Sequence, residues 1–333
     1  MKKNIFKNDK IFIAGSSGMA GSAIKKTLLK NQYGKKEFGG ILLTPNRKEL
    51  NLLDYNSVKN WFEYNQPDVV IVAAAEVGGI IANCSRAADF ILNNLKMQTN
   101  IIENAWKNKT RRLLFLGSSC IYPRSSPQPI KEDYLLSGYL EPTNQWYAIA
   151  KIAGIKLCQA LRLQYDFDAI SLMPTNLYGP GDNYSLNESH VMASFIRKFY
   201  EASKNNYPNV TCWGTGTPLR EFMHVKDLGN AVLYALENWD PKSSCAPKDS
   251  NGDRLSILNV GTGVDISIKD LAKKIAKATN FKGEILWDLS KPDGTPKKQL
   301  DIVNIKELGW SPTIDLDTGI QATLKSFSLE YKS

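Results

Sequence analysis

The chain has 333 residues, 43% of them apolar, so it is long enough for one large or two modest domains with a packed core. The net charge of +9 is spread along the chain, which suits an anionic ligand such as a nucleotide, and no motif for binding nucleic acid is present. No apolar run is long enough to span a membrane. Five cysteines without CxxC spacing argue against a metal site or a disulfide framework and favour a reducing cytoplasm.

The first half of the chain alternates strand patterns with helix patterns. Strands are predicted at residues 10–15, 39–44, 67–75, 111–119 and 169–174, and helices at residues 19–31, 54–65, 89–108 and 147–165. Strands that alternate with helices form parallel sheets that are covered on both faces. The sequence therefore predicts an α/β fold with a Rossmann-type, doubly wound parallel sheet.

This alternation stops after about Tyr178, where Gly, Pro and Asn become frequent. One clear helix is predicted over residues 265–279, with Ser267 and Asp270 at the spacing of a capping box. We expect a dinucleotide-binding domain in residues 1–178 and a smaller, mixed α/β substrate-binding domain mainly in residues 179–333, with some segments returning to the first sheet. Folds of this kind bind ligands at the carboxyl ends of the strands.

A glycine-rich turn follows the first predicted strand and opens the first helix. It reads “GSSGMAG” and contains Gly15, Ser16, Ser17, Gly18, Met19, Ala20 and Gly21. Its GxxGxxG spacing is a variant of the dinucleotide fingerprint, in which glycines allow a tight turn, the approach of a pyrophosphate and close packing of helix on strand. The sequence therefore predicts that a dinucleotide cofactor binds at this turn.

The second predicted strand indicates which dinucleotide binds. Enzymes that use NAD usually carry a carboxylate at its end, which bonds the ribose 2′-hydroxyl. Here Asn46 and Arg47 follow the strand, and Arg47 suits a 2′-phosphate. This favours NADP(H) over NAD. Asp54 further on could reach the adenine or could serve only as a helix cap.

Tyr147 and Lys151 lie four residues apart, so they share one face of a predicted helix. A lysine beside a tyrosine lowers the pKa of the phenol, and such a phenol can protonate a carbonyl oxygen as a hydride reaches the carbon. Ser118, at the end of a preceding strand, could polarise the same carbonyl. The sequence predicts a Ser–Tyr–Lys reductase site over the sheet.

Longer motifs along nearly the whole chain point to a family. They include “IFIAGSSGMAGSAI”, “LLFLGSSCIYP”, “YAIAKIAGIKLC”, “WGTGTPLREFMHV” and “KPDGTPKKQLD”. On these motifs the chain resembles the extended short-chain dehydrogenase/reductase family and, within it, the GDP-L-fucose synthases. The resemblance implies an NADP(H)-dependent, homodimeric, cytoplasmic enzyme that epimerises GDP-4-keto-6-deoxy-D-mannose at C3 and C5 and then reduces it at C4, giving GDP-L-fucose.

The resemblance also implies roles at matching positions. Cys120 and His190 would be the base and acid of epimerisation, beside the triad of Ser118, Tyr147 and Lys151. The GDP-sugar would contact Ser119, Asn176, Lys198, Trp213, Arg220 and Asp293. The cofactor would contact the glycine turn, Lys151 and a second set of residues: Asn46, Arg47, Leu50, Asp54, Ala74, Pro174, Asn176 and Leu177.

Some positions depart from the family pattern. Ser17 and Pro45 stand where relatives often carry arginines for the 2′-phosphate, and Lys198 stands in place of an arginine. Two alternatives therefore stay open. One is a reductase that acts only at C4 of a related GDP-4-keto sugar, such as a 6-deoxy-heptose. The other is a catalytically silent, cofactor-binding protein, against which the intact triad argues.

Overall fold

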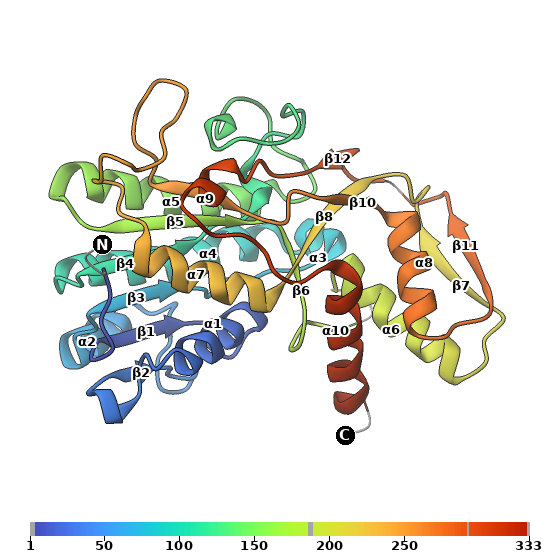
Figure 1. Ribbon diagram of the computed structural model, residues 1–333, viewed down its shortest axis with the longest axis horizontal. Coiled ribbons are helices and arrows are strands. Elements are labelled where there is room, and N and C mark those ends of the chain that lie inside the picture. The colour runs from blue at the N-terminus through green and yellow to red at the C-terminus, as the bar shows by residue number, and fades with distance from the viewer. Residues whose placement is uncertain (1–3, 186–188, 292, 332–333) are drawn as a thin grey trace.

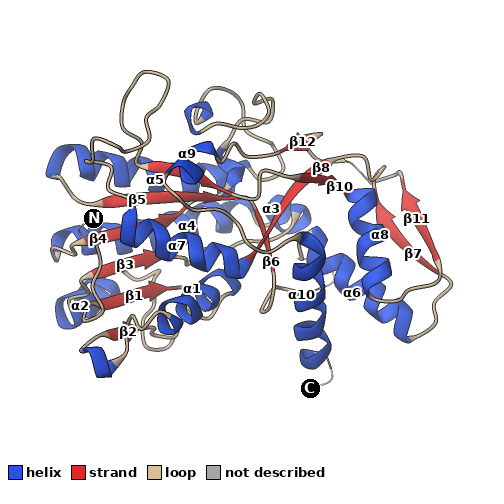
Figure 2. Cartoon of the chain, viewed as in Figure 1, coloured by secondary structure: helices blue, strands red, loops and turns tan. Residues whose placement is uncertain are grey.

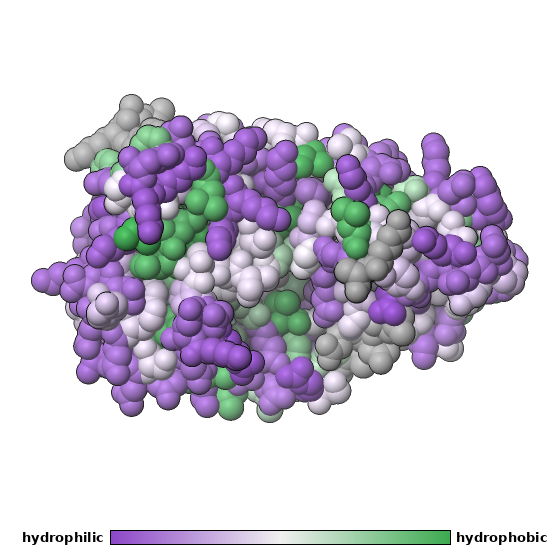
Figure 3. Space-filling model, turned by 90° about the horizontal axis from the view of Figure 1, so that it is seen from below, coloured by the Kyte–Doolittle hydropathy of each residue, from purple (hydrophilic) through white to green (hydrophobic). Residues whose placement is uncertain are grey.

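The computed structural model describes residues 4–185, 189–291 and 293–331. It has two parts (Figure 1). The larger part is a broad sheet with helices on both faces, and the smaller part, at the other end of the molecule, combines short strands with helices. No helix of the described residues is both long and apolar enough to cross a lipid bilayer. The face seen in Figure 3 is mostly hydrophilic, with small separate hydrophobic areas.

The large sheet has six parallel strands in the order β2-β1-β3-β4-β5-β9. These are β1 (Lys10–Ala14), β2 (Ile41–Leu43), β3 (Val69–Val72), β4 (Arg112–Leu116), β5 (Ala169–Pro174) and β9 (Ile257–Val260). The strands β3, β4, β5 and β9 are buried throughout, as expected when both faces of a parallel sheet are covered. The predicted doubly wound α/β fold is confirmed.

Helices cover both faces of this sheet (Figure 2). One layer contains α1 (Met19–Lys30) and α7 (Val225–Asn238), and the other contains α2 (Tyr55–Asn65), α4 (Ala87–Lys107) and α5 (Gln145–Tyr165). Gly229 of α7 allows close packing, because a Cβ there would lie 2.5 Å from Thr27 Oγ1 of α1. Gly154 of α5 does the same, because a Cβ there would lie 2.6 Å from Phe115 Cζ of β4. Close packing of this kind fixes α5 on the sheet.

The strand order places a topological switch point at β1. This strand pairs with β2 on one side and with β3 on the other, while α1 and α2 lie in different layers. Ligands of open α/β sheets bind in the crevice at such a point, outside the carboxyl ends of the strands. The glycine turn begins at Gly15, directly after β1, and therefore lies at this crevice.

The smaller part is built on two short sheets. One contains β8 (Leu219–His224), β10 (Asp265–Ser267) and β12 (Lys297–Lys298), with β6 (Asn176–Tyr178) paired to β8, and the other pairs β7 (Asn209–Trp213) with β11 (Glu284–Asp288). Its helices are α6 (Val191–Lys204), α8 (Ile268–Ala278) and α10 (Leu316–Glu330). Two short helices, α3 (Ile80–Ser85) and α9 (Val303–Glu307), complete the chain.

The helix predicted over residues 265–279 is shorter in the structure. Residues 265–267 pair with β8 as the strand β10, and Ser267 is the N-cap of α8, accepting a hydrogen bond from Asp270 N at 3.0 Å. The helix begins only after its cap, because pairing with a distant strand fixes the preceding residues as extended backbone.

The second half of the chain returns to the large sheet. The strand β9 forms one edge of that sheet, and α7 packs on α1. The hydrophobic core around the sheet also includes Trp310, far along the chain. A domain boundary near residue 178 stays a prediction.

Candidate active site

The end of β4 and the beginning of α5 bring Ser118, Tyr147 and Lys151 together. Ser118 lies close enough to the Tyr147 hydroxyl to influence its pKa. Lys151 Nζ lies 5.8 Å from the centre of the Tyr147 ring and donates a hydrogen bond to Leu116 O at 2.7 Å. The three side chains predicted as a reductase triad thus form one cluster at the carboxyl end of β4.

The electrostatics of this cluster differ from the prediction that Lys151 lowers the pKa of Tyr147. Burial of the phenol is the largest effect and raises the pKa of Tyr147, the nearby Cys120 raises it further, and the neighbouring Ser118 hydroxyl lowers it. Burial also lowers the pKa of Lys151 to about 7. Because Lys151 bonds a backbone carbonyl and not the phenol oxygen, desolvation outweighs its charge. Tyr147 is therefore a protonated phenol at neutral pH.

Cys120 lies two residues beyond Ser118, in the short 3₁₀ helix Ser119–Ile121. Ser118 Oγ accepts a hydrogen bond from Cys120 N at 3.2 Å, which places the thiol beside the triad. Asn144 Nδ2 lies 3.4 Å from Cys120 Sγ, and Lys298 Nζ lies 3.6 Å from the same sulfur. The sequence analysis assigned no role to Asn144 or Lys298, although Lys298 lies in the motif “KPDGTPKKQLD” and Asn144 lies three residues before Tyr147.

The two histidines occupy different helix termini. His190 is the N-cap of α6 and is exposed. No hydrogen bond links His190 to Cys120 among the described residues, so their predicted partnership in proton transfer stays a prediction. His224 Nδ1 accepts a hydrogen bond from Lys226 N at 3.2 Å and caps α7, which is a structural role.

The glycine turn has the shape that a dinucleotide requires. Gly15 has a φ of +81°, and a Cβ there would lie 2.6 Å from Ala74 N. A Cβ at Gly21 would lie 2.1 Å from Gly15 O, so α1 packs closely on the turn. At Gly18, by contrast, a Cβ would make only ordinary contact, 3.5 Å from Gly15 O. Packing within the chain does not require a glycine at position 18, and its missing side chain leaves room for a pyrophosphate at the N-terminus of α1.

The remaining predicted cofactor residues have varied environments. Asp54 caps α2 by accepting a hydrogen bond from Ser57 N at 2.7 Å, so of the two interpretations the capping one is observed. Leu50 is 3% exposed and belongs to the core, and Pro174 is the last residue of β5. Asn46 and Arg47 are exposed beyond β2, while Ser16, Met19, Ala20, Ala74 and Leu177 are half-buried and Ser17 is exposed.

The predicted substrate residues lie mainly in the smaller part. Lys198 Nζ lies 5.7 Å from the centre of the half-exposed Trp213 ring. The Asp293 carboxylate accepts hydrogen bonds from Thr215 N at 3.0 Å and Thr215 Oγ1 at 2.7 Å. Burial lowers the pKa of Arg220, and the neighbouring Glu141, Cys120 and Asp293 oppose this effect. These contacts connect the smaller part to the Cys120 loop.

Two predicted substrate residues make contacts within the protein. Asn176 Nδ2 donates a hydrogen bond to Glu221 O at 2.8 Å. Ser119 is only 3% exposed. The contact of Ser119 with a GDP-sugar stays a prediction.

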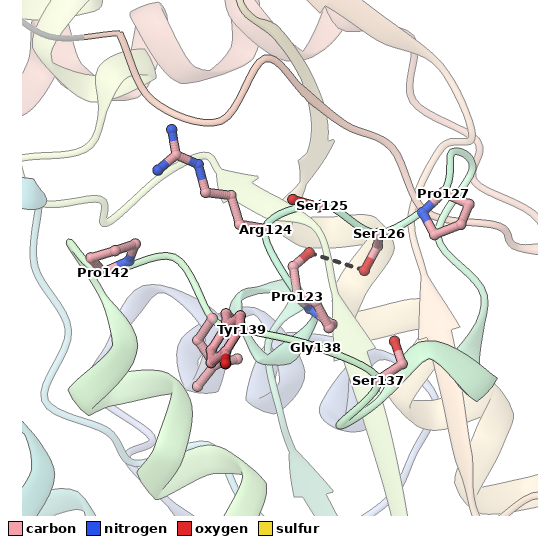
Figure 4. A pocket seen from close by; sticks show the side chains of 10 residues that line it. Pro123, Arg124, Ser125, Ser126, Pro127, Ser137, Gly138, Tyr139 and Pro142 are labelled. Atoms are coloured by element: carbon pink, nitrogen blue, oxygen red, sulfur yellow. Dashed lines mark hydrogen bonds between the residues drawn. The ribbon is translucent and has the colours of Figure 1, made fainter.

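A cavity of about 420 Å³ opens beside this region (Figure 4). It lies between residues 123–127, which follow the Cys120 turn, and residues 137–142, which precede α5. Ser126 Oγ donates a hydrogen bond to Pro123 O at 2.9 Å across its floor. None of its lining residues is a predicted site residue, so this cavity is separate from the candidate site.

Comparisons with known proteins agree with this geometry. The profile of the NAD dependent epimerase/dehydratase family matches residues 11–249. GDP-L-fucose synthase from Escherichia coli strain K12 is 48% identical over 318 residues, which cover 96% of each chain.

Two solved structures are similar to this chain in fold, and one of them contains bound NADP. The crystal structure of a GDP-6-OMe-4-keto-L-xylo-heptose reductase from C. jejuni has a TM-score of 0.88, is 32% identical and covers 98% of this chain and 99% of its own. That of a GDP-L-fucose synthetase from Naegleria fowleri bound to NADP has a TM-score of 0.85, is 26% identical and covers 99% of this chain and 95% of its own.

Proposed function

The chain belongs to the NAD dependent epimerase/dehydratase family, and from this membership and its assembled site we propose that it makes GDP-L-fucose. The reaction is 3,5-epimerisation of GDP-4-keto-6-deoxy-D-mannose followed by NADPH-dependent reduction at C4. The observation that carries the proposal is the cluster of Ser118, Tyr147 and Lys151, with the Cys120 thiol on the turn that follows Ser118.

Reduction converts the C4 ketone into an alcohol. NADPH, when bound, supplies the hydride that attacks C4. Tyr147 gives its phenolic proton to the carbonyl oxygen, and its raised pKa means that the proton is present at neutral pH. Ser118 orients this phenol and can donate to the same oxygen. Lys151, buried below the ring, positions the cofactor ribose and supports reprotonation of Tyr147.

Epimerisation uses the acidity of the hydrogens on carbons beside a ketone, since the resulting carbanion is an enolate. A base removes a proton from C3 or C5, and an acid returns one to the opposite face of the carbon. We assign Cys120 as the base and His190 as the acid. Lys298 Nζ, 3.6 Å from the sulfur, can stabilise the negative charge on a thiolate.

A second candidate is a reductase that acts only at C4 of a related GDP-4-keto sugar. It is favoured by the likeness to a heptose reductase, with a TM-score of 0.88. To separate the two, the purified protein would be given NADPH with either GDP-4-keto-6-deoxymannose or its heptose analogue, and NMR and mass spectrometry would identify the product. NADPH oxidation with neither sugar would contradict both candidates and leave a cofactor-binding protein.

We expect the protein to bind NADPH about tenfold more tightly than NADH. Arg47 is exposed, so its attraction to the 2′-phosphate is screened by solvent. Arg47→Ala should therefore weaken NADPH binding only about two- to fivefold and leave NADH binding unchanged, as measured by fluorescence titration. Lys48→Ala, at the next exposed position, is the control. Equal affinities of the unmodified protein for the two cofactors would contradict the NADP preference.

We also propose that the protein is a homodimer that assembles through α4 and α5. Large apolar side chains are exposed on both helices, among them Leu92 at 50% and Leu163 at 90%. Sedimentation equilibrium should give a dimer, and Leu163→Asp should yield monomers because it places a charge in the apolar contact. Leu329→Asp, at an exposed position of α10, should stay dimeric. A monomeric unmodified protein would contradict the proposal.

We place the enzyme in the cytoplasm, where its substrate class and cofactor would be available. The cysteines at positions 120, 158, 212 and 245 are free thiols, as in a reducing compartment.

A further inference from the structure

Lys25 lies on α1, one helical turn after Gly21 of the glycine turn. Long side chains on helices lean toward the helix N-terminus, which here points to the carboxyl edge of the sheet. Lys25 Nζ accordingly reaches Thr44 Oγ1, at 3.3 Å. Thr44 is the first residue after β2. An ammonium group therefore stands at the end of the second strand, beside the turn that would hold the pyrophosphate.

The surroundings of Lys25 leave its charge available. Both Lys25 and Thr44 are half-buried, so the ammonium is partly shielded from solvent. Among the described residues, Lys25 takes part in no ion pair with a carboxylate. Glu49, the acidic residue that follows β2 most closely in sequence, accepts a hydrogen bond from Asn46 N at 2.7 Å and so closes its own turn.

We infer that Lys25 binds the 2′-phosphate of NADP(H) and is the main determinant of the preference for NADPH. In Rossmann folds the end of the second strand is where the ribose 2′-oxygen is recognised, and a carboxylate there selects NAD. An ammonium at that place attracts a phosphate instead, and the Thr44 hydroxyl both fixes Nζ and offers a donor of its own. Lys25 thus supplies a positive charge that relatives often obtain from arginines at the positions of Ser17 and Pro45.

This inference rests on the NADP dependence within the proposed function. It also predicts which of two cationic side chains, Lys25 or Arg47, contributes more to the preference for NADPH. Arg47 is exposed, so water and salt screen it, while Lys25 is half-buried and anchored. Lys25 therefore contributes the larger share of the discrimination between the two cofactors.

The test is a cofactor-binding titration of the full chain, followed by nicotinamide fluorescence. Lys25→Met keeps the length of the side chain but removes its charge, and should weaken NADPH binding about five- to tenfold, which is most of the preference for NADPH over NADH. NADH binding should change less than about twofold. Lys26→Met, at the exposed neighbouring position, should leave both affinities unchanged.

A competitor separates the phosphate from the rest of the cofactor. Adenosine 2′,5′-bisphosphate should displace NADPH from the unmodified protein more effectively than AMP does, and Lys25→Met should abolish this advantage. Lys25→Arg, which keeps a cation, should retain most of the NADPH preference. Circular dichroism would verify that each variant is folded.

Equal weakening of NADPH and NADH by Lys25→Met, or no weakening of either, would overturn the inference. If Lys25→Met does not fold, the loss of NADPH preference in Lys25→Arg would overturn it instead. These titrations contain no sugar, so they test cofactor binding alone. If the proposed reaction is wrong, the turnover assay fails while the protein still discriminates between NADPH and NADH.

Discussion

Tyr147→Phe is expected to lower the rate of ketone reduction by about 10²–10⁴-fold, the usual contribution of general acid catalysis. The substitution removes the hydroxyl that lies near Ser118 and carries the transferred proton, but it keeps the ring whose centre lies 5.8 Å from Lys151 Nζ. The rate would be measured as NADPH oxidation at saturating sugar and cofactor. Binding of NADPH should survive, because the glycine turn is untouched.

Tyr139→Phe is the matched control for this prediction. Tyr139 lies on the rim of the separate cavity and is 96% exposed, so the loss of its hydroxyl should leave the rate unchanged. A Tyr147→Phe enzyme that reduces the sugar at nearly the unmodified rate would show that another group donates the proton.

Cys120→Ser is expected to remove the exchange of substrate hydrogens with solvent. In D₂O without NADPH, the unmodified protein should incorporate deuterium at C3 and C5 of GDP-4-keto-6-deoxymannose. A serine hydroxyl is a much weaker base than a thiolate at neutral pH, so the variant should show little uptake. NMR of the recovered sugar would measure both positions. The variant should still reduce a substrate that is already epimerised.

Cys245→Ser is the control, because that thiol is exposed on a loop outside the site. His190→Ala should slow completion of epimerisation, since an acid would be missing. If the unmodified protein takes up no deuterium from D₂O into a sugar that it reduces, the bifunctional proposal is wrong and the C4 reductase becomes the preferred function.

The first half of the fold was predictable because its signals are local. Buried runs such as Val69–Val72, the glycine turn and the Asp54 cap each lie within a few residues of chain, and the structure contains each of them. In the second half, β12 is two residues long and β6 is three residues long. Both pair with β8, which lies far from each of them in the sequence. Such strands have no pattern of their own and exist because a partner is present.

The site was predictable in part for the same reason. Ser118 and Tyr147 could be placed from a strand end and a helix, but the contact of Lys298 with Cys120 joins residues 178 positions apart. The pKa of Tyr147 could not be predicted from spacing either. A shared helix face brings Lys151 near, but only the packing shows that both groups are desolvated and that the ammonium bonds Leu116 O.

The position of β9 at the edge of the large sheet has a consequence for how the protein is made. On the ribosome, β5 emerges long before residues 257–260, which are its only strand partner on that side. At synthesis rates of about 5–20 residues per second, the nascent sheet keeps an open strand edge for several seconds. Open edges pair with other extended chains. A chain that stalls before residue 257 would therefore be a target for chaperones and an origin of aggregation.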